Sequence, residues 1–435
     1  MRRTAKAAAA VAGISLALAA CGSDSGTTNE PAAQTSAPTA NPADIKADLT
    51  WWDTSDATNE GPAFKELIAE FNKTYPNVKI NYQSVPFGEA QNKFKTAAAA
   101  KSGAPDILRA EVAWVPEFAS LGYLYELDGT ELTADAADFL ETPSSSTKYN
   151  GKTYGVPQVT DSLALMYNKK LLTDAGISAA PKTWDELKAA AATIKEKTGK
   201  NAVYLNPQGY FMLPFIYGEG GDLIDPEAKK ITVNAPESVA GVEKEQELLK
   251  SPGFAKPPAT DAYTGMMNEF KAGNVAMIIN GPWEVNNIKS ATTFGGLENL
   301  GIAPVPSGSK KAGAPVGGHN YVVWSGMPQE KAAGAIAFIK FMSSAESQAK
   351  LADKLGLLPT RASAYDKVSN PIISEFKPVM DVAVARAWIP EGGKLFGPLD
   401  EAATKALVQG ADAQATLDEV ANKYKTEVVK DYATQ

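Results

Sequence analysis

The sequence predicts an α/β protein with more than one domain. Two patterns support this fold class: apolar residues that recur at the helical period, and shorter apolar runs that alternate with them along the chain. Such alternation predicts a largely parallel sheet covered by helices. The 435 residues exceed the length of one ordinary domain. No Pro- or Ser-rich linker divides the folded part, so short crossings between domains are expected.

The first elements follow this alternation. Residues 49–52 form a short apolar run typical of a strand, and Pro62 predicts the first turn of a helix with one apolar face. Alternating residues over 78–82 predict the next strand. Residues 89–102 predict a helix closed by a glycine, and 105–108 predict a further strand.

Later segments continue the pattern. Thr183 and Glu186 form a capping box, T-x-x-E, which predicts a helix that runs to Gly199. A helix is also expected over 114–121, and mainly helices from about Pro328 onward. Further strands are expected at 163–167, 202–205, 277–279 and 321–324.

The first residues have the features of an export signal. A positively charged start precedes an uncharged run that ends at Ala20 and is too short to span a membrane comfortably. Small residues directly before Cys21 resemble a bacterial lipobox, in which the cysteine is acylated and becomes the new N-terminus. A plain secretory signal is the alternative. We predict a lipoprotein signal peptide at 1–20, lipidation of Cys21 and a flexible tether over 21–47.

Composition excludes several function classes. The net charge of −8 argues against a nucleic-acid binder, which usually carries a basic patch. A single histidine and a single cysteine remove most metal-site and thiol chemistry. No nucleophile elbow, phosphate-binding loop or zinc-protease motif occurs in the sequence. We therefore expect no metal and no organic cofactor. A glycosidase needs only two carboxylates, so that class stays open.

Several segments resemble the maltose/maltodextrin-binding family of solute-binding proteins of ABC transporters. They follow the family's order over nearly all of the chain after the signal: 49–56 (LTWW…D), 103–107 (GAPDI), 149–152 (YNGK), 162–169 (SLALMYNK), 181–186 (PKTWDE), 270–273 (FKAG) and 276–283 (AMIINGPW). The PDI and YNK pieces are shared by many extracellular sugar-binding proteins, whereas NGPW together with the others is more specific. The resemblance implies a two-lobed, periplasmic-binding-protein-like (type II) α/β fold with a hinge and a ligand cleft between the lobes.

The same resemblance implies how the chain divides between the lobes. The N-terminal lobe is expected to comprise 48–158 and 316–365. The C-terminal lobe is expected to comprise 163–305 and 370–435. Each lobe is then discontinuous in sequence, and the ligand is held between segments that lie far apart along the chain.

Four candidate residues are implied by the resemblance and suit a sugar. A sugar ring presents an apolar face and a rim of hydroxyl groups, which aromatic rings and carboxylates recognise. Asp56 matches a carboxylate that binds hydroxyls, and Asp161 stands where the family has a glutamate near the hinge. Tyr210 and Trp283 match residues that stack on sugar rings. The structural alternatives are a turn or cap for Asp56 and core positions for the aromatic pair.

One stretch departs from the family pattern. After PDI the family often has Trp-Ala-x-Asp-Arg, whereas this chain lacks the tryptophan and the Asp-Arg pair at those places. We expect Arg109, Glu111 and Trp114 to supply stacking and hydrogen bonds in a different layout. The alternatives are a solvated pair of Arg109 with Glu111, and a buried helix start at Trp114.

Three further residues are candidates for lining the cleft. His319 and Asn320 follow two glycines at the start of an expected strand. Phe396 lies near the place where the family supplies an aromatic platform. A lone histidine is more often structural or site-lining than catalytic, and no Ser or Asp triad order surrounds this one.

The sequence therefore predicts a binding protein that does no chemistry. We expect a lipoprotein on the outer face of the cytoplasmic membrane that captures maltose or maltodextrins and delivers them to the transmembrane subunits of an ABC permease. A monomer is expected, with no nucleic-acid partner. The alternatives are a binder of another di- or oligosaccharide such as trehalose, a secreted glycoside hydrolase, and a purely structural surface lipoprotein.

Overall fold

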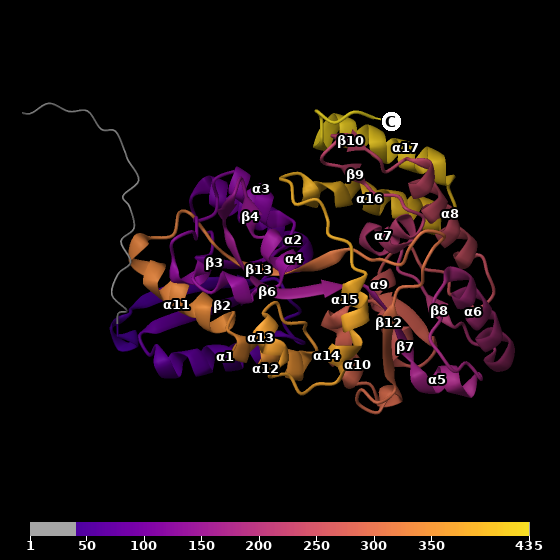
Figure 1. The fold of residues 1–435 in the computed structure, drawn as a ribbon, viewed down its shortest axis with the longest axis horizontal. Helices are drawn as coiled ribbons and strands as arrows, with labels where there is room; N and C mark the ends of the chain where they lie inside the picture. Colours follow the sequence, from indigo (N-terminus) through magenta and orange to yellow (C-terminus); the bar gives the residue numbers. More distant parts are fainter. Residues whose placement is uncertain (1–40, 435) are drawn as a thin grey trace, which may run out of the picture. The chain divides into compact units, whose positions relative to one another are not determined.

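Two β-sheets, each covered by helices, form the framework of the fold (Figure 1). The computed structural model describes residues 41–434. The predicted signal peptide, Cys21 and the predicted tether up to residue 40 lie outside the described residues. Where that tether was expected to end, Pro42–Asp44 form a 3-10 turn, and the first strand begins at Ala47.

The first sheet has five strands in the order β2-β1-β3-β13-β6. β1 (Ala47–Asp53) runs parallel to β2 (Val78–Ser84) and β3 (Ile107–Glu111). β13 (Val316–Val323) is antiparallel both to β3 and to β6 (Gly155–Ser162). The prediction of a largely parallel sheet is wrong for these last two strands, because β6 carries the chain toward the second sheet and β13 brings it back.

The second sheet has four strands in the order β12-β7-β11-β8. β7 (Ala164–Asn168) is antiparallel to both of its neighbours, β11 (Met277–Asn280) and β12 (Leu300–Pro304), while β8 (Val203–Tyr204) is parallel to β11. Only Leu163 separates β6 from β7. The chain therefore passes from one sheet to the other within a single residue.

Helices fill the connections and confirm the sequence pattern. The helices predicted from Pro62, over 89–102, over 114–121 and from Thr183 are present, and Thr183 Oγ1 accepts a hydrogen bond from the Glu186 amide at 3.1 Å as the capping box requires. The helices are α1 (Gly61–Thr74), α2 (Phe87–Ala100), α3 (Trp114–Ser120), α4 (Glu141–Ser145), α5 (Lys169–Asp174), α6 (Trp184–Thr198), α7 (Gly209–Gly218), α8 (Pro236–Leu249), α9 (Ala262–Lys271), α10 (Val285–Lys289), α11 (Ala332–Met342), α12 (Ala345–Leu355), α13 (Ala362–Tyr365), α14 (Ile372–Glu375), α15 (Lys377–Asp381), α16 (Phe396–Ala403) and α17 (Ala413–Lys423). Two short strand pairs lie outside the two main sheets: β4 (Lys148–Tyr149) with β5 (Lys152–Thr153), and β9 (Ile224–Asp225) with β10 (Lys230–Ile231).

Consecutive tryptophans of β1 anchor the two faces of the first sheet. Trp51 is fully buried, and its ring lies 5.4 Å from Phe64 of α1 and 5.4 Å from Phe338 of α11. Trp52 belongs to the buried cluster on the other face, together with Phe94 of α2. Successive side chains of a strand point to opposite faces, so the Trp51-Trp52 pair fixes helices on both sides.

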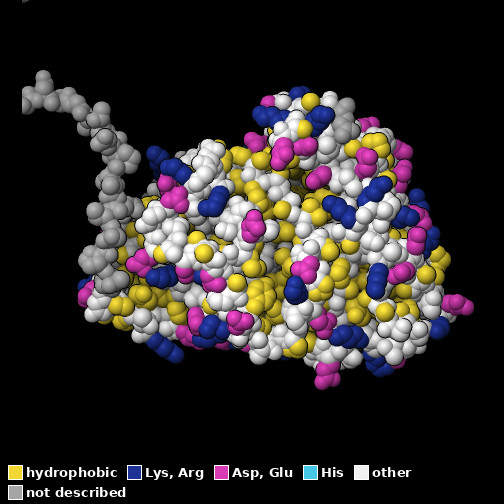
Figure 2. All heavy atoms as spheres, viewed as in Figure 1, with side chains coloured by type: hydrophobic (Ala, Val, Ile, Leu, Met, Phe, Trp, Pro, Cys, Tyr) yellow, Lys and Arg dark blue, Asp and Glu magenta, His cyan; other side chains and the backbone are white. Residues whose placement is uncertain are grey.

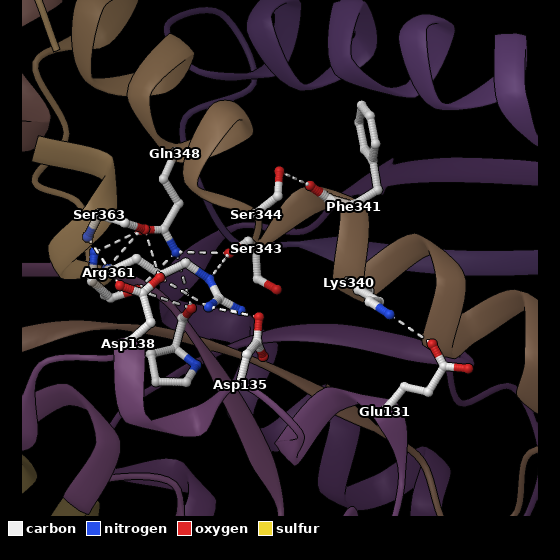
Figure 3. Close-up of polar contacts among 12 residues, drawn as sticks. Glu131, Asp135, Asp138, Lys340, Phe341, Ser343, Ser344, Gln348, Arg361 and Ser363 are labelled. Carbon is white, nitrogen blue, oxygen red and sulfur yellow. Dashed lines mark hydrogen bonds and ion pairs between the residues drawn. The ribbon is translucent and has the colours of Figure 1, made fainter. Parts of the chain in front are cut away.

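A buried polar network around Arg361 packs against this sheet (Figure 3). Arg361 is 4% exposed, and its Nε donates to the Ser343 carbonyl at 2.6 Å. Nη1 forms ion pairs with Asp135 at 2.9 Å and Asp138 at 3.2 Å. The guanidinium carbon lies 3.9 Å from the centre of the Phe139 ring. A buried charge is tolerated where it is paired in this way.

The same network holds the start of β6. Gln348 donates from Nε2 to Thr360 Oγ1 at 2.8 Å, and Thr360 Oγ1 donates in turn to the Pro157 carbonyl at 3.1 Å. The Thr160 amide of β6 donates to the Leu358 carbonyl at 3.2 Å. The strand that leaves the first sheet is therefore held on its free edge by the segment before α13.

The surface and the helices show how the chain meets solvent. On the face in Figure 2, acidic and basic side chains are interspersed rather than gathered by sign. Among residues 41–434, no helix combines the length and the apolar character that crossing a membrane requires. The described residues fall within one compact unit, so the predicted division into lobes at 48–158 with 316–365 and 163–305 with 370–435 stays a prediction.

Glu245 in α8 gives a stability prediction. It is 1% exposed, neither carboxylate oxygen has a hydrogen-bond partner among the described residues, and burial raises its pKa well above the usual value. The folded state thus holds the proton that the unfolded state releases, and stability falls as pH rises above the unfolded-state pKa. We expect Glu245→Gln to raise the free energy of unfolding by about 2 kcal/mol at pH 8 and far less at pH 4.5.

Urea unfolding at both pH values measures this effect. Glu243→Gln, at an exposed position of the same helix, is the control and should change little at either pH. An equal effect of Glu245→Gln at the two pH values would contradict the prediction.

Candidate functional site

Five of the ten predicted site residues lie around one arginine that the sequence analysis did not single out. That arginine is Arg386, in the irregular segment between α15 and α16. The five residues come from five separate elements of the chain: Glu111, Asp161, Tyr210, His319 and Phe396.

Backbone pairing places Arg386 beside the start of β13. The Val384 amide donates to the Ala314 carbonyl at 2.8 Å, and the Val316 amide donates to the Val384 carbonyl at 2.9 Å. Two residues further on, Arg386 Nε donates to the Val316 carbonyl at 2.8 Å. Arg386 Nη2 forms an ion pair with Glu111, at the end of β3. The guanidinium therefore links β13 of the first sheet to the last residue of β3.

Three aromatic rings surround the Arg386 guanidinium. Its carbon lies 5.7 Å from the centre of the Tyr210 ring, 5.5 Å from Trp388 and 5.5 Å from Phe396. The Tyr210 and Phe396 rings lie 6.0 Å apart. Trp388, also missed at the sequence level, donates from Nε1 to Ser145 Oγ of α4 at 3.0 Å. The predicted stacking residues Tyr210 and Phe396 thus share one aromatic group with a tryptophan from the Arg386 segment.

A β-bulge between β6 and β13 aims the polar residues of the site. His319 pairs with Val159 and Asn320 with Pro157, so Gln158 is the extra residue. Gly318 sits here with φ of +129°, and a Cβ at this position would lie 2.2 Å from the Val159 carbonyl oxygen. Only glycine accommodates both conditions. The bulge is therefore encoded by a glycine, as is frequent beside functional sites.

A second glycine makes room for Asp161 and Tyr210. A Cβ on Gly317 would lie 2.2 Å from Asp161 Oδ1 and 2.7 Å from the Tyr210 hydroxyl, so both polar groups occupy the space that a side chain would fill. Asp161 is 7% exposed, and burial raises its pKa to about 7, with Arg386 opposing and Glu111 adding to the shift. Asp161 is therefore a buried acid poised near neutral pH.

His319 offers two unused hydrogen-bonding atoms. Neither ring nitrogen has a partner among the described residues. Burial, together with the positive charges of Arg109 and Arg386, lowers the pKa of His319 well below its usual value. The neutral imidazole thus presents one donor and one acceptor. The exposed ring of Phe87, which the sequence analysis missed, lies 6.1 Å from His319.

Trp114 and Arg109 are more deeply built into the fold. Trp114 is 5% exposed at the start of α3 and stacks on Phe87, with ring centres 5.2 Å apart. Arg109 is fully enclosed: Nε donates to Gln158 Oε1 at 2.8 Å, and Nη2 donates to Glu60 Oε2 at 3.3 Å. The alternative of a solvated Arg109–Glu111 pair is wrong, because Arg109 is buried, the Glu111 side chain is only 13% exposed, and each pairs with another partner.

Asp56 occupies the turn before α1. Its side chain is exposed, and Oδ1 accepts hydrogen bonds from the Thr58 amide and hydroxyl, both at 2.7 Å. Burial acts to raise the pKa of Asp56, but the bonds from Thr58 and Asn59 outweigh it and lower that pKa. These contacts match the structural alternative, a turn residue. The neighbouring Asn59 instead contacts the segment that follows β11 of the second sheet: its Nδ2 donates to the Trp283 carbonyl at 3.0 Å.

Trp283 belongs to a row of aromatic rings that leads to Tyr210. Its Nε1 donates to the Tyr263 hydroxyl at 2.7 Å. Phe211 lies between, with its ring 6.0 Å from Tyr263 and 5.9 Å from Tyr210. Trp283 is half-buried, so part of its surface is free to meet a ligand.

Asn320 lies away from the other candidates. It is fully buried, and its Nδ2 donates to Ser146 Oγ at 3.0 Å. Because successive strand residues face opposite sides of a sheet, Asn320 and His319 point in opposite directions from β13. Asn320 is not part of the cluster around Arg386, and its role in the site stays a prediction.

Comparison with known proteins defines the class. The chain belongs to the bacterial extracellular solute-binding protein family, whose sequence pattern matches residues 54–349. Among solved structures, the GacH receptor of Streptomyces glaucescens, determined unliganded and in complex with acarbose and an acarbose homolog, is 44% identical with a TM-score of 0.85 and aligns over 89% of this chain and 100% of that chain. The likeness confirms the two-lobed fold that the sequence predicts.

Curated relatives point in the same direction. A maltotriose-binding protein of Pyrococcus abyssi is 26% identical over 382 residues, covering 86% of this chain and 80% of the relative. A maltooligosaccharide ABC transporter solute-binding lipoprotein of Streptococcus pneumoniae is 28% identical over 364 residues, covering 77% of this chain and 81% of the relative. The resemblance to the maltose/maltodextrin-binding family is thus confirmed.

Gly318 gives a prediction for the bulge. We expect Gly318→Ala to cost more than about 3 kcal/mol of unfolding free energy, because a Cβ would meet a backbone oxygen as well as a strained φ. Gly410→Ala is the control: its φ is +73° but nothing lies within 4 Å of the added Cβ, so about 1 kcal/mol is expected. Thermal and urea unfolding measure both, and equal costs would contradict the role assigned to the bulge.

Proposed function

We propose that this chain is the substrate-binding lipoprotein of an ABC importer and captures maltose/maltodextrin-type oligosaccharides outside the membrane. The observation that carries the proposal is the cluster around Arg386. It combines three aromatic rings with the buried carboxyl group of Asp161, the partly buried one of Glu111, and a histidine whose ring nitrogens have no partner among residues 41–434.

The chemistry of this cluster suits a saccharide. The apolar faces of sugar rings pack on Tyr210, Phe396 and Trp283, which bury large rigid surfaces at low entropic cost. Sugar hydroxyls both donate and accept, so they match the acceptor oxygens of Asp161 and the paired donor and acceptor of His319. We assign these five residues to direct contact with the ligand.

Arg109 and Asp56 have a positioning role in this proposal. Arg109 ties Glu60 to the bulge residue Gln158, and Asp56 shapes the turn from which Asn59 reaches Trp283. Trp114 and Phe87 form the rim next to His319. The ligand then meets residues from both sheets at once, so binding favours the arrangement in which the two lobes approach.

The ligands of the similar proteins support the ligand class. One relative is named for maltotriose and another for maltooligosaccharides, and the GacH receptor was determined with acarbose. Acarbose is therefore a second candidate ligand, favoured by the 44% identity of that receptor. Another di- or oligosaccharide such as trehalose stays the alternative within this class.

We further propose the partners and the location. The family is extracellular, and a lipid on Cys21 would anchor the protein to the outer face of the cytoplasmic membrane. The transmembrane subunits of an ABC permease receive the sugar. The protein works as a monomer and performs no reaction on its ligand.

A ligand panel tests the function. Residues 22–435 are titrated by calorimetry with maltose, maltotriose, acarbose, trehalose and lactose. Saturable binding of maltotriose or acarbose is expected. Binding of trehalose or lactose alone would keep the sugar-binding function and change the ligand, and silence across the panel would contradict the function. Shorter products after incubation with maltotetraose would indicate a hydrolase instead.

Trp283→Ala tests the aromatic contacts. We expect a loss of about 2 kcal/mol in binding free energy, roughly a thirtyfold rise in Kd, as at other buried aromatic anchors. Trp324→Ala is the control and should leave Kd nearly unchanged. Trp324 is half-buried and directly follows the last residue of β13, away from the His319 side of the strand. Unaltered calorimetric affinity of Trp283→Ala would remove this residue from the site.

A further inference from the structure

Arg386 is surrounded by more aromatic rings, and makes fewer hydrogen bonds, than a buried guanidinium needs for its stability alone. A buried guanidinium needs a counter-charge and hydrogen-bond acceptors, and Glu111 with the Val316 carbonyl supplies them through Nη2 and Nε. No hydrogen bond joins Nη1 to another described residue. One edge of the guanidinium is thus left without a hydrogen-bond partner among the described residues, beside three aromatic rings.

Arg361 shows what a purely structural buried arginine looks like in the same chain. Its guanidinium carbon lies 3.9 Å from the Phe139 ring centre, in direct stacking contact, and two aspartates flank it (Figure 3). Arg386 stands 5.5–5.7 Å from three ring centres and stacks closely on none of them. Arg386 therefore differs from Arg361 in having no ring in close stacking contact and no second carboxylate paired with it.

We propose that Arg386 is a ligand-binding residue of this site, which donates hydrogen bonds to saccharide hydroxyl or ring oxygens while the neighbouring rings pack on the sugar. Glu111 acts through Arg386 as a positioning residue. The inference rests on the proposed sugar-binding function and adds to it the residue that supplies the fixed donors.

The balance of donors and acceptors supports this assignment. Asp161 supplies acceptor oxygens, and the neutral His319 supplies a single donor, whereas both oxygens of Glu111 are taken by Arg386 and the Ala113 amide. A saccharide carries many oxygens that accept as well as donate, so a site of carboxylates alone would leave acceptors unmatched. The planar guanidinium offers several donors in a fixed plane, which an ammonium group does not.

A matched pair of substitutions tests the proposal. Arg386→Lys keeps the charge that Glu111 requires but loses the planar donors, and Arg361→Lys makes the same change in the network of Figure 3. With maltotriose as the probe and acarbose in parallel, we expect at least a tenfold rise in Kd for Arg386→Lys. Arg361→Lys should change Kd less than twofold, while thermal unfolding reports the stability of both variants.

The outcomes separate this inference from the proposed function. If the unmodified protein binds neither probe, the proposed function fails. If it binds and Arg386→Lys binds within twofold of it, the role of Arg386 is overturned and the function stands. Equal losses of affinity in the two variants would also overturn the role, since they would reflect a general loss of structural stability.

A measurement on the unmodified protein covers the case in which Arg386→Lys does not fold. Residues 22–435 contain three arginines, Arg109, Arg361 and Arg386, so arginine-specific nitrogen-15 labelling gives three side-chain Nε signals. Arg361→Lys and Arg109→Lys assign two of them. Saturating maltotriose should shift the Arg386 signal and leave that of Arg361 in place. A stationary Arg386 signal under saturation would overturn the proposal.

Discussion

The antiparallel pairing of β6 with β13 is the constraint on which the rest of the structure depends. These strands are the chain's route out of the first sheet and back into it, and their bulge at Gln158, with Gly318 beside it, sets which side chains face the site. A shift of one residue in a strand pairing turns every following side chain to the other face. Asp161 and His319 lie on the same face of this strand pair only because this register is fixed.

Much of the fold could be predicted because its helices and first strands carry local signals. The alternation around β1 to β3 and the capping box before α6 are of this kind. β6 was not predicted: all eight of its residues are buried, including polar ones, so neither alternation nor a continuous apolar run marks it. α7 was not predicted either, because it contains a proline, a residue that usually ends a helix.

The site was predictable where a motif carried it and not where tertiary contacts did. Tyr210 and Trp283 were found through segments with a family pattern, and their rings belong to one aromatic row. Arg386 lies in an irregular segment with no motif, and only the pairing of Val384 with its neighbours brings it to Glu111. An arginine followed two residues later by tryptophan was the one available signal.

Buried charge is distributed unevenly through the chain. Arg361 and Arg109 sit in networks where carboxylates neutralise them, and the Ser343 carbonyl and the Gln158 side chain respectively complete their bonds. Glu245 has no such partner among the described residues, and burial raises its pKa well above the usual value. The networks hold strands in place, whereas the isolated acid marks a position where the core has not been optimised.

The place of His319 has a practical consequence. It is the one histidine in the chain, and it stands in the candidate site with both ring nitrogens unpartnered among the described residues. Histidine ring protons resonate apart from most other carbon-bound protons, so this protein carries a built-in, assignment-free reporter at its candidate ligand site. Occupancy, exchange between conformations and ligand competition become readable from a single resonance, without labelling or substitution.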